Sequence, residues 1–140
     1  MIFLSYITYI NFTDKVLIMK EIYRLIRRLG IHSNLSGYHF LARAVELVAD
    51  DNSLLMGMSG RLYSKIANDF HTSSSSIDRN LRTVVHMIWD RSYIHNLEEL
   101  AGYTIDYKPS SGEVIDVLAA YYNHYLRKIP NPGEISADFF

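Results

Sequence analysis

The chain has 140 residues, 49% of them hydrophobic and 21% charged, which allows one globular domain with a real core and excludes a disordered chain. It has no cysteine, which excludes disulfides, thiolate metal sites and cysteine nucleophiles and fits a cytoplasmic location. A net charge of −1 excludes a strongly basic field over the whole chain. Affinity for DNA depends on where cations lie, however, and most of them lie between residues 20 and 92.

The first ten residues are strongly apolar, but a membrane span needs about 20 residues, and the pattern of a signal peptide is missing. We therefore expect no membrane contact. We predict that residues 1–18 form an N-terminal extension outside the fold and that Met19 opens a domain that ends at residue 127. The tail, residues 128–140, is rich in Pro and Gly and is predicted to be flexible.

Apolar residues recur at helical spacing along most of the domain, which predicts an all-α fold, a compact bundle of about six helices. The predicted helices cover residues 20–29, 38–50, 60–70, 74–92, 96–101 and 113–126. Gly30 is a plausible stop signal for the first of them. A brief alternation of apolar and polar residues at 103–107 is the only strand-like pattern.

Residues 62–92 form one unit, in which a short helix, a polar turn and a longer helix follow one another. Ala67 is small, as it must be where two helices cross closely. Three apolar side chains are placed to seal the angle between the helices, namely Ile66, Phe70 and Ile77. Ser75 and Asp78 have the spacing of a capping box for the second helix. This order predicts a helix-turn-helix.

The second helix of this unit divides into two faces at 100° per residue. Its apolar face carries Ile77, Leu81, Val84, Val85 and Ile88, and its polar face carries Ser75, Arg79, Arg82, Thr83, His86 and Asp90. Two guanidinium groups one turn apart suit bidentate hydrogen bonding to guanine, and a threonine suits a thymine methyl group. We predict base readout by Arg79, Arg82 and Thr83. We predict phosphate or groove-edge contacts by Ser73, Ser75, Ser76 and His86.

Residues 26–51, 63–94 and 100–119 resemble, in the same order, the C-terminal effector domain of the sporulation response regulator family, the stage-zero master regulators of endospore-forming bacteria. The most specific parts are the pattern from Ile66 to Trp89 and the following Gly102-Tyr103-Thr104. The resemblance implies a six-helix bundle with a helix-turn-helix.

The resemblance also places Arg79 and Arg82 on the family's two base-reading arginines. Thr83 stands where the family usually has a histidine, Ser76 where it has a phosphate-contacting arginine, and His86 where it has an acidic residue. The family joins this domain to an N-terminal receiver that is phosphorylated. Residues 1–19 cannot form a receiver, so we expect a free-standing effector domain that binds DNA constitutively.

Two functions of different classes remain. The first is a sequence-specific transcription regulator whose partner is double-stranded DNA, bound as a homodimer on tandem half-sites, with a full-length regulator or RNA polymerase as further partners. The second is a protein-interaction module that modulates a full-length regulator and binds DNA weakly or not at all. The tyrosine-rich run Tyr121, Tyr122 and Tyr125 favours the second function, although core packing explains tyrosines at helical spacing more simply.

An enzyme is not expected. The six histidines show no His-Glu-x-x-His spacing, the serine cluster lacks a Gly-x-Ser-x-Gly elbow, and no glycine-rich phosphate loop is present. We therefore expect no catalytic residues, no metal and no cofactor.

Overall fold

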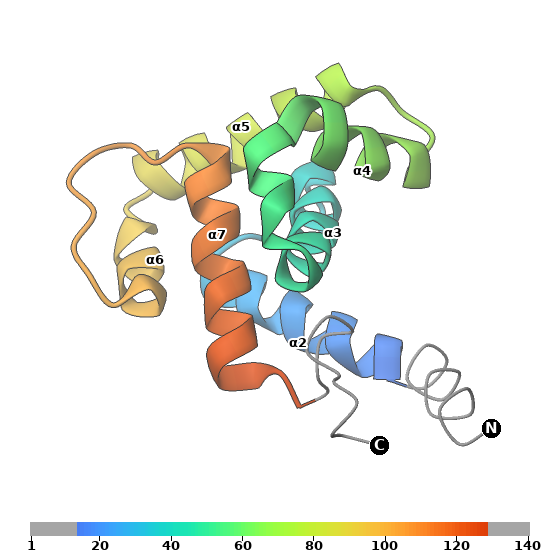
Figure 1. Ribbon diagram of the computed structural model, residues 1–140. Coiled ribbons are helices and arrows are strands. Elements are labelled where there is room, and N and C mark those ends of the chain that lie inside the picture. The colour runs from blue at the N-terminus through green and yellow to red at the C-terminus, as the bar shows by residue number, and fades with distance from the viewer. Residues whose placement is uncertain (1–13, 129–140) are drawn as a thin grey trace.

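The computed structural model describes residues 14–128, in which every regular element is helical and no strand occurs (Figure 1). The α-helices are α2 (Lys15–Arg28), α3 (Ser36–Asp50), α4 (Tyr63–Asp69), α5 (Ser74–Asp90), α6 (Ile94–Ala101) and α7 (Ser111–Tyr121). The described part of the chain also contains three short helical turns, η2 (Asn52–Gly57), η3 (Met58–Leu62) and η4 (Tyr122–Leu126). The expected all-α bundle of about six helices is confirmed over the described residues.

Helix α3 lies at the centre of the bundle and packs against α2, α5 and α7. Ten of its 15 residues are buried, because apolar side chains occur on most of its circumference rather than on one stripe. In Figure 1, α5 lies along one side of the molecule and α2 along the opposite side, with α3 and α7 between them. The core that α3 organises therefore supports two outward surfaces, one on α5 and one on α2.

The first helix is longer than expected. Helix α2 begins at Lys15 instead of about residue 20, and the partly buried Ile18 and Met19 continue the apolar stripe that anchors it on the core. The predicted extension of residues 1–18 therefore overlaps α2 by four residues. The rest of that extension up to residue 13, and residues 129–140 of the predicted tail, lie outside the described residues.

The segment at 103–107 is a loop and not a strand. Its alternation arises because Ile105 is buried while Tyr103 and Tyr107 are exposed. The backbone N–H of Ile105 donates to the Glu98 carboxylate at 2.7 Å, so its hydrogen-bond partner is a side chain of α6 and not a neighbouring strand. This contact ties the loop between α6 and α7 to the body of the domain.

Candidate nucleic-acid interface

Helices α4 and α5 form a helix-turn-helix, as the sequence predicts. Ile66 and Ile77, on either side of the turn, are both fully buried, and Ala67 is buried where the helices approach each other. Phe70 is less enclosed than expected, with 41% of its surface exposed, and its ring meets Phe40 edge to face at a centroid distance of 5.1 Å. The angle between the two helices is therefore sealed by the isoleucines and steadied from outside by the phenylalanine pair.

The turn between the helices is closed by backbone hydrogen bonds. The Thr72 N–H donates to the Ala67 carbonyl at 2.9 Å, across a His71 whose φ is +54°. Helices commonly end in this way, with one residue in the left-handed conformation and a hydrogen bond from the next N–H to the carbonyl five residues earlier. The chain can thus reverse into α5 within four residues.

Ser73 is the residue that caps α5. Its hydroxyl oxygen accepts a hydrogen bond from the Ser76 N–H at 3.1 Å, which satisfies one of the free amides of the first turn. The predicted capping box of Ser75 and Asp78 is wrong, because α5 begins two residues earlier than that pairing requires. Ser75 is instead exposed on the outer surface near the start of the helix.

The apolar face predicted for α5 is its buried face. The five residues concerned are each no more than 5% exposed: Ile77, Leu81, Val84, Val85 and Ile88. The six residues of the predicted polar face, Ser75, Arg79, Arg82, Thr83, His86 and Asp90, are all exposed. The division of α5 into a core-facing and an outward face is therefore confirmed. The bundle presents this helix to solvent along its whole length.

The two arginines on this face have different surroundings. The Arg79 guanidinium makes no hydrogen bond or ion pair among the described residues and is exposed. Arg82 is held by Asp78, one turn earlier, since Nε lies 3.2 Å from Oδ1 and Nη2 lies 3.2 Å from Oδ2. This side-on contact leaves the Nη1 group and the far edge of the guanidinium open, and 75% of the Arg82 side chain is exposed.

Thr83 and His86 are both engaged in local contacts. The Thr83 hydroxyl donates to the Arg79 carbonyl at 3.1 Å, so its hydrogen is already used within the helix. His86 Nε2 lies 2.7 Å from an Asp90 carboxylate oxygen, and its Nδ1 lies 3.2 Å from the Lys108 ammonium. Lys108 therefore places a positive charge beside His86 at this end of the face.

The serines at the start of α5 are placed unequally. Ser73 and Ser75 are exposed, whereas Ser76 is half-buried and its hydroxyl accepts from the Asn80 amide at 3.3 Å. The first two therefore lie where a ligand can approach the N-terminus of α5. Ser76 is the least accessible of the predicted phosphate contacts.

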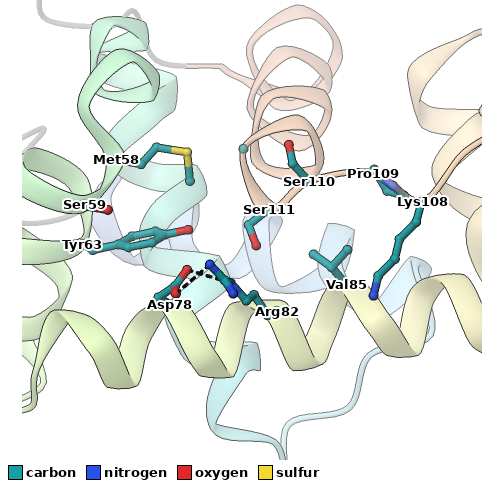
Figure 2. A pocket seen from close by; sticks show the side chains of 11 residues that line it. Met58, Ser59, Tyr63, Asp78, Arg82, Val85, Lys108, Pro109, Ser110 and Ser111 are labelled. Carbon is teal, nitrogen blue, oxygen red and sulfur yellow. Dashed lines mark hydrogen bonds and ion pairs between the residues drawn. The ribbon is translucent and has the colours of Figure 1, made fainter.

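A groove of about 450 Å³ lies beside the polar face, between α5, η3 and the start of α7 (Figure 2). Asp78, Arg82 and Val85 form its α5 wall, and Lys108 extends from the loop before α7 toward α5 beyond Val85. Sequence reasoning missed Lys108, which is 22 residues from His86 along the chain. A lysine before a Pro-Ser-Ser-Gly turn carries no local signal of its position beside α5.

Among the described residues, no helix combines the length and apolar character needed to cross a lipid bilayer. The sequence profile of the family described as "Sporulation initiation factor Spo0A C terminal" matches residues 22–122, which include all the helices from the buried part of α2 to the end of α7. The match covers well over half of the chain, and the helix-turn-helix lies entirely within it. The chain therefore belongs to the Spo0A C-terminal family, whose members are DNA-binding effector domains of sporulation transcription factors.

Proposed function

We propose that this domain is a sequence-specific transcription regulator that inserts α5 into the major groove of its operator. The observation that carries the proposal is the exposed face of α5, with Arg79 and Arg82 one turn apart on a helix whose opposite face is buried in the bundle. A helix anchored in this way can enter the groove as a rigid body, and guanidinium groups suit the paired acceptors of guanine.

Asp78 supports the role of Arg82 as a base reader. An exposed arginine samples many rotamers, and holding it by one hydrogen bond and an ion pair lowers the entropy that is lost when it contacts a base. The contact uses the Nε edge, so the Nη edge remains available for guanine O6 and N7. In this proposal Asp78 is a positioning residue, and Thr83 offers its methyl group to a neighbouring thymine.

Phosphate contacts in the proposal come from both ends of the reading helix. Ser73 and Ser75 lie at the N-terminus of α5, where free backbone amides and the helix dipole favour an anion. Lys108 supplies a cation near the other end, beside His86. Two such anchors fix the register of the helix on the duplex without carrying sequence information.

The test is a fluorescence anisotropy titration with a family-like operator box and a set of single-base-pair substitutions. We expect Arg79→Ala and Arg82→Ala each to weaken binding to the preferred box about 5- to 150-fold and to abolish preference at one base pair each. The matched control is Arg91→Ala, an exposed arginine just beyond α5, which should leave the base preference unchanged. Equal affinity of the wild type for a scrambled duplex would overturn the proposal.

A second candidate function is the protein-interaction module, favoured by the exposed end of the tyrosine run. Tyr122 belongs to the core, but Tyr125 is 67% exposed and packs on the half-buried Tyr121 at a centroid distance of 4.8 Å. Together they border a hollow of about 350 Å³ between α6 and α7. Capture of a full-length regulator or RNA polymerase that survives nuclease treatment and is lost in Tyr125→Ala supports this function. If nuclease treatment abolishes this capture, the proteins are joined through DNA, for example as tandem copies on adjacent half-sites.

A further inference from the structure

The cations of the domain are concentrated on α2 and not on the reading helix. Helix α2 carries five lysines and arginines against one glutamate, whereas α5 carries two arginines against two aspartates. Phosphate binding requires local positive charge, because it proceeds by release of the counterions that surround DNA. The helix proposed to read bases is therefore not the main source of positive potential on this molecule.

The basic residues of α2 lie on the side of the helix that faces solvent. Lys20, Arg24 and Arg27 fall within a narrow sector at 100° per residue, opposite the buried Ile22 and Ile26. These three residues, called here the α2 basic face, span about 10 Å of helix axis. All three are exposed.

The α2 basic face forms one wall of a groove of about 420 Å³, and Ser33, Tyr38 and His39 contribute to the rest of its lining. No aspartate or glutamate lines this groove. Glu21, the one acid within α2, contacts Arg24 at 3.1 Å, an exposed pair that is screened by salt. Lys20 has no ion-pair or hydrogen-bond partner among the residues described.

Aromatic side chains hold the groove in shape. Tyr23 stacks on Tyr38 with ring centroids 5.0 Å apart, and the Tyr23 hydroxyl lies 3.1 Å from His39 Nδ1. The Arg27 guanidinium lies 5.9 Å from the centre of the Tyr38 ring, which fixes its position while leaving its charge open to solvent. The cations are therefore presented by a preorganised surface, which reduces the entropy lost on binding.

We infer that the α2 basic face binds the phosphate backbone of a second DNA segment, independently of sequence, while α5 holds the operator. Helices α3 and α7 lie between α2 and α5 in Figure 1, and no residue of the α2 basic face belongs to α5. A duplex carries about six phosphate charges over 10 Å of its axis. Each of the three cations of the α2 basic face can therefore find a phosphate partner. This inference rests on the proposed function, since it assumes that α5 engages the operator.

DNA is favoured over an acidic protein segment by the membership of the chain in a DNA-binding family and by the even spacing of the cations along one helix. A molecule that holds the operator on α5 and a second duplex on the α2 basic face bridges the two duplexes. The partner in this proposal is any double-stranded DNA, with no requirement for an operator sequence.

The first test is a bridging assay with an immobilised operator duplex, bound protein, and a free fluorescent duplex without the operator box. The wild type should retain the free duplex, and Arg24→Gln with Arg27→Gln should lower its retention at least tenfold. The matched control is Lys15→Gln with Lys128→Gln, which removes two exposed cations outside the α2 basic face and should retain the duplex as the wild type does. Equal loading of all three proteins on the operator shows that each is folded.

The second test does not depend on operator binding. Affinity for a duplex without the operator box is measured between 50 and 200 mM salt, for the wild type and for the double arginine variant. Two phosphate contacts fewer should reduce the slope of log K against log salt by about 1.8, so the wild type loses about 12-fold more affinity than the variant over this range. Equal slopes would overturn the inference.

The outcomes separate this inference from the proposed function. Operator binding without retention of the second duplex overturns the inference and leaves the function of α5 intact. If the wild type shows no preference for the operator but its salt slope still exceeds that of the double arginine variant, the proposed function is overturned and the role of the α2 basic face is supported. Capture of a poly-glutamate peptide without capture of the second duplex assigns the groove to an acidic protein segment and overturns the inference.

Discussion

Substitution of Gly37 by alanine should damage both the fold and the DNA-reading helix. Gly37 lies in the first turn of α3, where the backbone of that helix touches α5. A Cβ at this position would lie 2.3 Å from Val84 Cγ2 and 2.8 Å from the Asn80 carbonyl oxygen. The carbonyl oxygen belongs to the backbone of α5 and cannot rotate away. To restore an ordinary 3.4 Å contact, helices α3 and α5 must separate by about 0.6 Å at the Asn80 oxygen and by about 1.1 Å at Val84 Cγ2.

Two opposing effects set the size of the change. Overpacking of a close helix contact costs about 1–3 kcal/mol, and Val84, which is β-branched, buried and on a helix, has little freedom to relieve it. The gain from replacing glycine by alanine in a helix is about 1 kcal/mol at most. Two contacts under 3.0 Å place the strain in the upper part of its range, about 2–3 kcal/mol, so we expect a net loss of about 1–2 kcal/mol in the free energy of unfolding. For a domain of this size the melting temperature falls by about 4 °C per kcal/mol.

The measurement is thermal unfolding followed by circular dichroism, together with affinity for the operator box well below the transition. Gly60→Ala is the matched control, because a Cβ at Gly60 meets nothing within 4 Å and the residue lies in a helical turn. It should be neutral or slightly stabilising. A Gly37→Ala protein that melts at or above the wild-type temperature would refute the close contact between α3 and α5.

Three further substitutions test single interactions. Asp78→Asn removes the anion beside Arg82, so we expect non-specific DNA affinity to rise and the ratio of specific to non-specific affinity to fall a few-fold in paired titrations. Ser73→Ala removes the cap of α5 and should cost about 1 kcal/mol in urea unfolding, whereas Ser73→Asn should retain it. The hydrogen bond from the Ile105 N–H holds the pKa of Glu98 below its usual value. The Glu98 carboxylate therefore stabilises the fold at a pH above its pKa in the unfolded chain. This stabilisation is lost as the pH falls through its pKa in the folded protein. The difference in urea midpoint between the wild type and Glu98→Gln should therefore shrink from about pH 6 to about pH 3, and a constant difference would argue against the contact.

The division of α5 into two faces could be predicted from sequence because it depends on helical periodicity alone. Each of its buried residues follows from a spacing of three or four, and that spacing does not depend on what covers them. The start of the helix was harder to place, because four consecutive serines offer several caps of similar quality. The geometry of the turn, with His71 in a left-handed conformation, decides among them in favour of Ser73.

The start of α2 illustrates a different limit. Ile18 and Met19 fit a helical stripe, but the strongly apolar residues before them obscure any periodicity, so the sequence alone does not show where the helix begins. Burial against the core decides the matter in the structure, since both side chains pack on it. Tertiary contacts, and not local propensity, thus set this helix boundary.

The surroundings of the two arginines depend entirely on tertiary structure and local rotamers. A spacing of four residues allows an ion pair between Asp78 and Arg82, but it does not show that the aspartate takes the Nε edge and leaves the other edge open. Arg79 and Arg82 are equivalent in the sequence pattern, yet only Arg82 is held in place. If both read bases, the restrained arginine should discriminate more sharply between base pairs, because it has less freedom to form alternative contacts with the wrong one. Comparison of the base-pair preferences lost in Arg79→Ala and in Arg82→Ala measures this difference, and a larger loss of discrimination for Arg79→Ala would contradict the role of Asp78.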